Sequence, residues 1–244
     1  RSAHGILPKL KCRPAIQPNY ERTARRYSTQ MLQPGALAAI RLVLASASPR
    51  RVELVRDNLG LSVEVCPSLF EETLLKADFP DARAYCQATA RGKALEVAAR
   101  CCFPRDVDQL VIAADTVVSL DGHMVMEKPR DKGHAAEMLR SLSGSQHSVI
   151  TAAALIFIPA EGGGTARERL FAEVTRVRFS KLSEGVVAAY VASGEPMDKA
   201  GGYGIQGKGG TLVEGIEGCY FNVVGLPINA LSREIIALLG LEES

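Results

Sequence analysis

Four short segments hold side chains whose types and spacing could act on a phosphate ester. They are SASPRR at 46–51, VIAADT at 111–116, EKP at 127–129 and the glycine-rich DKAGGYGIQG at 198–207. Together they offer basic and hydroxyl donors, several acids and flexible glycine loops, which suits an anionic ester bound with a metal ion. None is a Walker loop, because the spacing G-x-x-x-x-G-K-[ST] does not occur, and no strand immediately precedes 198–207 as a dinucleotide fingerprint requires.

The segment 46–51 lies between a predicted strand and the start of a predicted helix. Free backbone N–H groups and the helix dipole favour an anion at such a position. The hydroxyl of Ser46 and the forked guanidinium groups of Arg50 and Arg51 add donors suited to phosphate. The alternative interpretation is an ordinary capped helix with exposed arginines.

Asp115 follows directly on the buried apolar run 111–114. Open α/β sheets bind ligands at the C-terminal ends of such strands, so its carboxylate is a candidate metal ligand or proton acceptor. An Asp that only starts a turn is the alternative, because a hairpin is expected over 117–125, turning at Asp121-Gly122. Lys128 follows that hairpin, which would return it beside Asp115.

Other polar residues receive smaller roles. Glu71-Glu72 offers a second carboxylate for a hard cation such as Mg²⁺, with a solvated acidic pair as the alternative. Lys93 points either at phosphates or at water, and the glycines of 198–207 either approach a ligand closely or form a flexible loop. The six cysteines contain no paired C-x-x-C, so we expect reduced thiols and neither a zinc site nor a disulfide framework.

The elements that must position these residues alternate between strand and helix, which predicts an α/β fold. Strands are expected over 41–45, 63–66, 111–114, 148–158 and 172–179, and helices over 50–59, 81–101, 132–142, 183–192 and 226–239. The two long mid-chain strands indicate that part of the sheet is antiparallel. Residues 194–218 are expected to be glycine-rich loops.

Composition excludes several classes of partner. The 244 residues carry a net charge of +2 and only 5% aromatic residues, which argues against a nucleic-acid or anionic-membrane surface. No apolar run is long enough to span a membrane. With 47% apolar residues the chain can bury a sizeable core.

Residues 1–40 form a basic, proline-interrupted leader that we expect to be disordered, with the folded domain at 41–244. Two interpretations of the leader remain open. Residues 1–30 are a mitochondrial transit peptide, or Met31 is the natural start and the protein is cytoplasmic.

Read in order, several motifs match one family. They are LVLASASPRR at 42–51, ARGKALEVA at 90–98, VIAADTVV at 111–118, EKPRD at 127–131, the segment 138–149, YVASGEPMDKAGGYGIQG at 190–207 and NVVGLP at 222–227. The set resembles the Maf family of nucleoside triphosphate pyrophosphatases over about residues 41–240. The resemblance implies a two-lobed, ITPase-like mixed sheet flanked by helices, with a central cleft. It also implies cleavage between the α and β phosphates, a divalent metal (Mg²⁺ or Mn²⁺) and a homodimer.

By match to the family motifs, Asp115 is the proton acceptor and a metal ligand. Glu72 looks like the second metal-side acid, although the register leaves open whether Glu71 takes that place. The residues that look like phosphate ligands are Ser46, Arg51, Lys93 and Lys128.

Three positions resemble the family branch that acts on dTTP and UTP, namely Arg50, Thr116 and Gln206. The amide of Gln206 offers both a donor and an acceptor to a pyrimidine edge. The chain also resembles the Maf-like region of acetylserotonin methyltransferase-like proteins. Three alternatives stay open: modified pyrimidine nucleotides, the same chemistry on 7-methyl-GTP, and a non-catalytic nucleotide-binding regulator of cell division.

Overall fold

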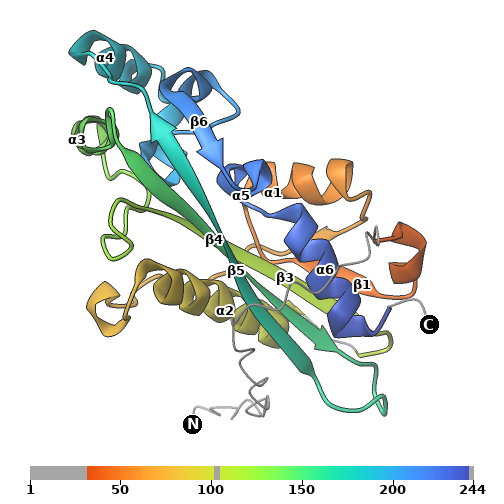
Figure 1. The fold of residues 1–244 in the computed structure, drawn as a ribbon. Coiled ribbons are helices and arrows are strands. Elements are labelled where there is room, and N and C mark those ends of the chain that lie inside the picture. Colours follow the sequence, from red (N-terminus) through yellow and green to blue (C-terminus); the bar gives the residue numbers. More distant parts are fainter. Residues whose placement is uncertain (1–31, 102–104, 242–244) are drawn as a thin grey trace.

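A six-stranded mixed sheet forms the centre of the computed structural model, which describes residues 32–101 and 105–241 (Figure 1). The strands are β1 (Arg41–Leu44), β2 (Glu64–Val65), β3 (Gln109–Ser119), β4 (Gln146–Ile158), β5 (Arg167–Phe179) and β6 (Val213–Glu217). They lie in the order β2-β1-β3-β4-β5-β6. Strands β2, β1 and β3 are parallel and the other neighbours antiparallel. The predicted α/β class with a partly antiparallel sheet is confirmed.

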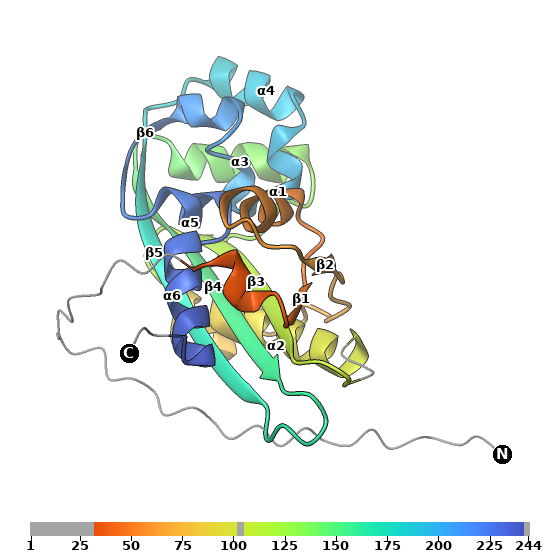
Figure 2. The ribbon, with the colours of Figure 1, turned by 90° about the vertical axis from the view of Figure 1, so that its right-hand side faces the viewer.

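Helices cover both faces of this sheet and one of its ends (Figures 1 and 2). They are α1 (Pro49–Glu53), α2 (Ala82–Cys101), α3 (Lys132–Leu142), α4 (Glu184–Ala192), α5 (Tyr220–Val224) and α6 (Ile228–Leu239). Short helical turns are η1 (Pro34–Leu37), the π-helical η2 (Leu54–Asn58), η3 (Lys76–Asp78), η4 (Glu195–Asp198), η5 (Ala200–Gly202) and η6 (Lys208–Leu212). Side-chain caps fix three helix starts: Asp81 accepts from the backbone N–H of Ala84 in α2, Asp131 from that of His134 in α3, and Ser183 from that of Val186 in α4.

Successive residues of a strand point to opposite faces of the sheet, so the core forms separate layers. Even-numbered residues of β3, such as Leu110 and Ile112, pack with α6 in one cluster. Odd-numbered residues, such as Val111 and Ala113, pack with α2 on the opposite face. A third cluster joins α3 and α4 to the far ends of β4 and β5. The structure therefore has two lobes that share the long strands: a main lobe with α2 and α6, and an α3–α4 lobe.

Strand β3 differs from the sequence prediction, because it does not end at Ala114. It pairs continuously with β4 from Gln109 opposite Ile158 to Ser119 opposite Ser148. Asp115 therefore lies within the strand and not at its end. Of the predicted hairpin, a single bridge between Val118 and Met126 is formed.

Two further boundaries are corrected. Within the expected loops 194–218, residues 213–217 form β6 on the free edge of β5. The predicted helix 226–239 begins at Ile228, because Pro227 precedes it as the N-cap.

The described part of the predicted leader is ordered. Residues 34–37 form η1, and Leu32 and Leu37 are buried in the main-lobe core. The expectation of disorder is therefore wrong for this stretch, while residues 1–31 lie outside the described part. Among the described residues, no helix has the length and apolar character needed to cross a bilayer.

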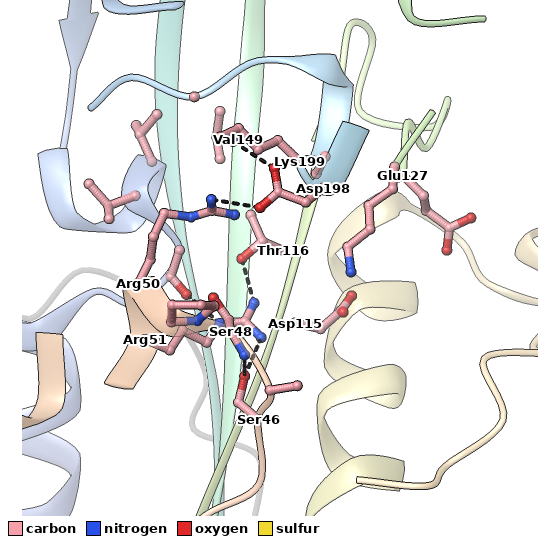
Figure 3. Close-up of a pocket in the computed structure, with 18 of the residues that line it drawn as sticks. Ser46, Ser48, Arg50, Arg51, Asp115, Thr116, Glu127, Val149, Asp198 and Lys199 are labelled. Atoms are coloured by element: carbon pink, nitrogen blue, oxygen red, sulfur yellow. Dashed lines mark hydrogen bonds and ion pairs between the residues drawn. The ribbon is translucent and has the colours of Figure 1, made fainter. Parts of the chain in front are cut away.

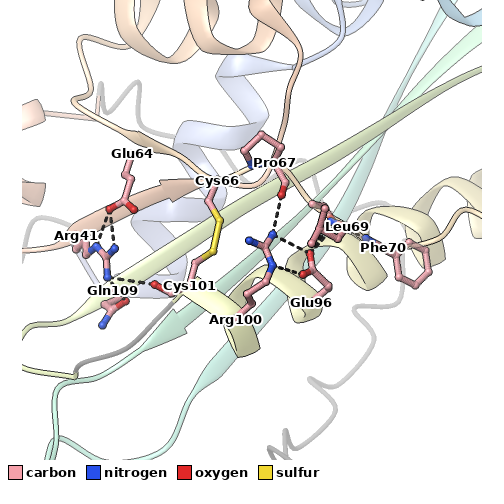
Figure 4. Close-up of a disulfide and its surroundings, with 11 residues drawn as sticks. Arg41, Glu64, Cys66, Pro67, Leu69, Phe70, Glu96, Arg100, Cys101 and Gln109 are labelled. Carbon is pink, nitrogen blue, oxygen red and sulfur yellow. Dashed lines mark hydrogen bonds and ion pairs between the residues drawn. A yellow bond between two sulfur atoms is a disulfide. The ribbon is translucent and has the colours of Figure 1, made fainter.

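A disulfide joins Cys66, directly after β2, to Cys101 at the end of α2 (Figure 4). The expectation of reduced thiols is wrong for this pair, while Cys86 and Cys219 are free. The sequence hides the pairing because 35 positions separate the two cysteines. Beside it, Arg100 donates to the carbonyl oxygen of Pro67 at 2.7 Å, and Glu96 accepts from Ser68 and from the backbone N–H of Leu69, so polar contacts also tie the segment after β2 to α2.

Candidate active site

A cavity of about 870 Å³ opens where β1 ends and β3 continues. The last residue of β1, Leu44, pairs with Ile112 of β3, and among the described residues no strand flanks the next residues of β3 on that side. The loop that follows β1, residues 45–48, turns along this free stretch and lines the cavity. Residues of both lobes form its walls. The sequence interpretation placed the candidate site at the end of the strand 111–114, whereas the cavity lies at the end of β1 and beside the middle of β3.

Asp115 and Thr116 lie on the free stretch of β3 and point to opposite faces of the sheet, because successive strand residues alternate. The carboxylate of Asp115 faces α2, where Lys93 lies. The Lys93 ammonium is 2.8 Å from Oδ1 of Asp115 and 2.8 Å from Oε1 of Glu72. One half-buried cation therefore joins two acids that come from separate segments.

Thr116 faces the other side and meets Arg51 (Figure 3). The guanidinium of Arg51 donates to Oγ1 of Thr116 at 2.9 Å. It also donates to the carbonyl oxygens of Ala114 at 2.8 Å and Gly225 at 2.9 Å, and to Oγ of Ser46 at 3.4 Å. Burial lowers the pKa of Arg51 from its ordinary value, although Asp115 opposes this.

Four of the five N–H groups of the Arg51 guanidinium are thus used inside the protein. The sequence interpretation made Arg51 a phosphate ligand. These contacts leave one N–H group of Arg51 to bind phosphate. They make the side chain mainly a structural link between α1, β3 and the end of α5.

Arg50 takes a different direction from its neighbour and reaches the α3–α4 lobe. Its Nη1 lies 3.0 Å from Oδ2 of Asp198, and Lys199 lies 2.6 Å from Oδ1 of the same carboxylate (Figure 3). Burial alone would raise the pKa of Asp198, but Lys199 and Arg50 outweigh it and lower the pKa. The ion pair spans the cavity from α1 to η4.

Glu127 and Lys128 form the wall that follows the bridge at Met126. Glu127 accepts from the hydroxyl of Tyr85 at 2.6 Å and pairs with Lys76 at 2.7 Å. Burial would raise the pKa of Glu127, but these two partners lower it. Lys128 is exposed within the cavity lining, where its charge is open to a ligand.

The nine predicted site residues all line this one cavity. They are Ser46, Arg50, Arg51, Glu72, Lys93, Asp115, Thr116, Lys128 and Gln206. Of the two adjacent acids, which are both exposed, Glu72 contacts Lys93 and lines the cavity, whereas Glu71 is not part of the lining.

The site residues that the sequence prediction missed are Glu127, Glu195, Asp198 and Lys199. Their signal is present in the segments EKP and GEPMDKAGG, which concentrate charge beside proline and glycine. Within residues 32–101 and 105–241, no three His, Cys, Asp or Glu side chains are grouped so as to hold a metal ion by themselves.

Comparison with known proteins gives one family model and several curated relatives. The family model described as "Maf-like protein" matches residues 41–238. A human protein named "Probable bifunctional dTTP/UTP pyrophosphatase/methyltransferase protein" is 48% identical over 207 residues, which are 84% of this chain and 33% of that protein. This chain therefore spans about a third of the length of the human relative.

A protein of Exiguobacterium sibiricum named "dTTP/UTP pyrophosphatase" is 45% identical over 197 residues, covering 80% of this chain and 91% of the relative. Among solved structures, a HAM1 protein from Coxiella burnetii is similar at 13% identity and a TM-score of 0.40, over 81% of this chain and 99% of that one.

Proposed function

Because this chain belongs to the Maf-like protein family, we propose that it hydrolyses dTTP and UTP to the nucleoside monophosphate and pyrophosphate. The proposal rests on the juxtaposition of Lys93, Asp115 and Glu72 in a cavity that both lobes line. Relatives 42–48% identical to this chain carry the name of that activity.

Asp115 is the base of the proposed reaction. Lys93 holds its Oδ1, which leaves Oδ2 to take a proton from water. The water oxygen bonds to the α-phosphorus as the bond from that phosphorus to the bridging oxygen breaks, and pyrophosphate leaves with that oxygen. Burial of Asp115, which is 8% exposed, keeps competing solvent away from the carboxylate.

Cationic groups around Asp115 offset the charge of the triphosphate. Lys93 and Lys128 approach the cavity from α2 and from the segment after Met126, so they face the phosphates from two sides. The hydroxyl of Ser46 and the one remaining N–H of Arg51 add donors beside the start of α1. Stabilising charge that develops in the transition state is the main contribution of such groups to phosphoryl transfer.

The donor chemistry of the site fits a divalent cation. Asp115 and Glu72 supply carboxylate oxygens, which Mg²⁺ and Mn²⁺ prefer, and two protein carboxylates suffice when substrate phosphates complete the shell. When bound, the metal supplies Lewis-acid neutralisation of phosphate charge.

We assign recognition of the nucleobase to Arg50, Thr116 and Gln206. All three line the cavity on the side of β3 opposite Lys93 or in the α3–α4 lobe. Gln206 is exposed in this lining, so its amide is available to a base edge. The same proposal includes a homodimer and a cytoplasmic place of action, which light scattering and cell fractionation test.

Pyrophosphate release by the purified chain tests the proposal. The nucleotides are dTTP, UTP, CTP, GTP, ATP and 7-methyl-GTP, each with Mg²⁺ or Mn²⁺. Preference for dTTP and UTP supports it. Preference for 7-methyl-GTP keeps the chemistry and overturns the base assignment. Binding without pyrophosphate release in any mixture overturns the catalytic proposal and favours a non-catalytic nucleotide-binding regulator.

A further inference from the structure

The loop that carries Gln206 is wrapped around one carboxylate, that of Glu195. Oε2 of Glu195 accepts from the backbone N–H of Lys208 at 3.0 Å, and Oε1 accepts from that of Gly209 at 3.1 Å. The hydroxyl of Tyr190 donates to Oε1 at 3.0 Å. A single acid from η4 therefore holds the outgoing side of the loop.

Tyr190, in α4, holds the incoming side of the same loop. Its hydroxyl accepts from the backbone N–H of Gly204 at 3.1 Å while it donates to Glu195. The two side chains thus fix the backbone at 204 and at 208–209, and Gln206 lies in the middle of the segment between them. Tyr190 is only 5% exposed and packs in the core of the α3–α4 lobe, so the anchor is itself held firmly.

The glycines of the loop are explained by this anchor. A Cβ on Gly207 would lie 2.5 Å from Oε1 of Glu195, and one on Gly209 would lie 2.5 Å from Oη of Tyr190 and 2.6 Å from the carbonyl oxygen of Gly204. The sequence interpretation of the glycines in 198–207 left two possibilities open, close approach of a ligand or a flexible loop. For these two positions, the close approach is to the protein's own Glu195 and Tyr190.

The negative charge of Glu195 makes its hydrogen bonds to the loop stronger than bonds between neutral groups would be. Burial alone would raise the pKa of Glu195, but the N–H groups of Gly209 and Lys208 and the Tyr190 hydroxyl outweigh it and lower the pKa. The carboxylate is therefore ionised near neutral pH and accepts charge-assisted bonds. The carbonyl oxygen of Glu195 also accepts from Lys199 at 2.7 Å, and through Asp198 this contact continues to Arg50.

We propose that Glu195, supported by Tyr190, is a positioning residue that fixes Gln206 in the cavity and thereby sets which nucleobase is accepted. The inference rests on the proposed function, because Gln206 reads a base only if the cavity binds a nucleotide. Glu195 acts through the loop backbone: its carboxylate is already engaged by three protein donors. The phosphate end of the cavity, at Lys93 and Asp115, is held by other contacts.

Two measurements on the full chain test this role. The first is amide hydrogen exchange of the peptide that covers 204–210, which needs no catalysis. In Glu195→Ala the amides of Lys208 and Gly209 lose their acceptor, so their exchange should accelerate about tenfold or more. The second is steady-state kinetics: KM for dTTP should rise about tenfold and the preference for dTTP over CTP should shrink, with kcat within about threefold of the parent.

Matched variants separate positioning from general damage. Glu195→Gln keeps an acceptor oxygen without the charge and should recover part of the protection and of the base preference. Glu184→Gln removes an exposed carboxylate of the same lobe that pairs with Arg140, and should leave both measurements unchanged.

Each outcome decides a separate part of the proposal. Unchanged exchange in Glu195→Ala overturns the anchoring. Faster exchange with unchanged KM and base preference overturns the role in specificity. If the parent chain releases no pyrophosphate from any nucleotide, the proposed function fails and the base-reading role fails with it, while the exchange measurement still decides the anchoring by itself.

Discussion

The ammonium nitrogen of Lys93 lies 2.8 Å from Oδ1 of Asp115, and the two side chains are 13% and 11% exposed. This contact joins α2 to β3 at the point where β3 has no neighbour on one side. The contact holds the Asp115 carboxylate in one orientation and places a positive charge beside its negative charge.

Asp115→Asn should lower kcat for dTTP by at least about 100-fold, because the amide cannot take a proton from water. The fold should persist, since asparagine has the same shape. Pyrophosphate release and circular dichroism measure the two effects. Asp57→Asn, on the exposed surface of η2, is the matched control and should keep full activity. Full activity in Asp115→Asn would refute the assignment of the base.

The Lys93–Asp115 pair should show strong coupling in folding. Lys93→Met leaves a largely buried carboxylate without its cation, and Asp115→Asn leaves the cation with Glu72 alone. We expect the double variant to be more stable than the sum of the two single losses by about 1–3 kcal/mol. Urea unfolding of the four proteins measures this coupling, and additive losses would contradict it.

Arg51→Lys should destabilise the fold by about 2–4 kcal/mol, because lysine cannot replace bonds to Ala114, Thr116 and Gly225 together. Arg50→Lys is the neighbouring control: its partner Asp198 is 60% exposed, so stability should change by less than about 1 kcal/mol. Thermal unfolding compares the two variants. Equal losses of stability in the two variants would show that Arg51 does not link these elements.

His147 should make the protein less stable in mild acid. It is buried against Tyr203 and Phe179, and burial lowers its pKa from 6.5 to about 4. Between these values the unfolded chain binds a proton that the folded chain does not, so this part of the stability is complete above pH 6.5 and is lost as the pH falls toward 4. The loss should reach about 3 kcal/mol.

Urea unfolding at pH 7.5 and 4.5 measures the effect. His147→Gln, which does not titrate, should flatten the dependence on pH. His134→Gln, at a half-buried position of α3, should keep the slope of the parent. An unchanged slope in His147→Gln would show that other groups cause the acid sensitivity.

Reduction of the disulfide should loosen the segment between β2 and Glu72. The Cys66–Cys101 bond closes a loop with a sequence separation of 35, for which chain entropy gives a stabilisation of up to about 4 kcal/mol. Reductant should therefore lower the Tm of the parent and leave that of Cys66→Ser unchanged. Cys219→Ser, which removes a free thiol, should respond to reductant like the parent. Peptide mapping that finds Cys66 as a free thiol would remove the basis of this prediction.

Regular elements with local signals could be predicted closely. The helix over 132–142 agrees at both ends, because Asp131 caps its start and leucines and alanines mark its buried face. Helix α4 agrees for the same reason, through Ser183. In such cases the deciding contacts lie within a few residues, which a sequence displays directly.

Features that depend on distant partners could not be predicted. Asp115 has the appearance of a strand end, and only the long register with β4 shows that β3 continues past it. Arg50 and Arg51 are equivalent in sequence, yet the helix turns them in different directions, toward Asp198 and toward Gly225. Glu195 attracts no notice beside the glycines that surround it until the loop is seen folded around its carboxylate.

The three long strands impose a limit on how the cavity can move. Strands β4 and β5 each run for 13 residues through the main lobe and into the α3–α4 lobe, and β3 accompanies them for 11. The strand residues that line the cavity, among them Asp115, Thr116 and Val149, therefore belong to one continuous sheet that runs through both lobes. The loops and helices around these strands can therefore move more easily than Asp115, whose backbone is held by the pairing of β3 with β4.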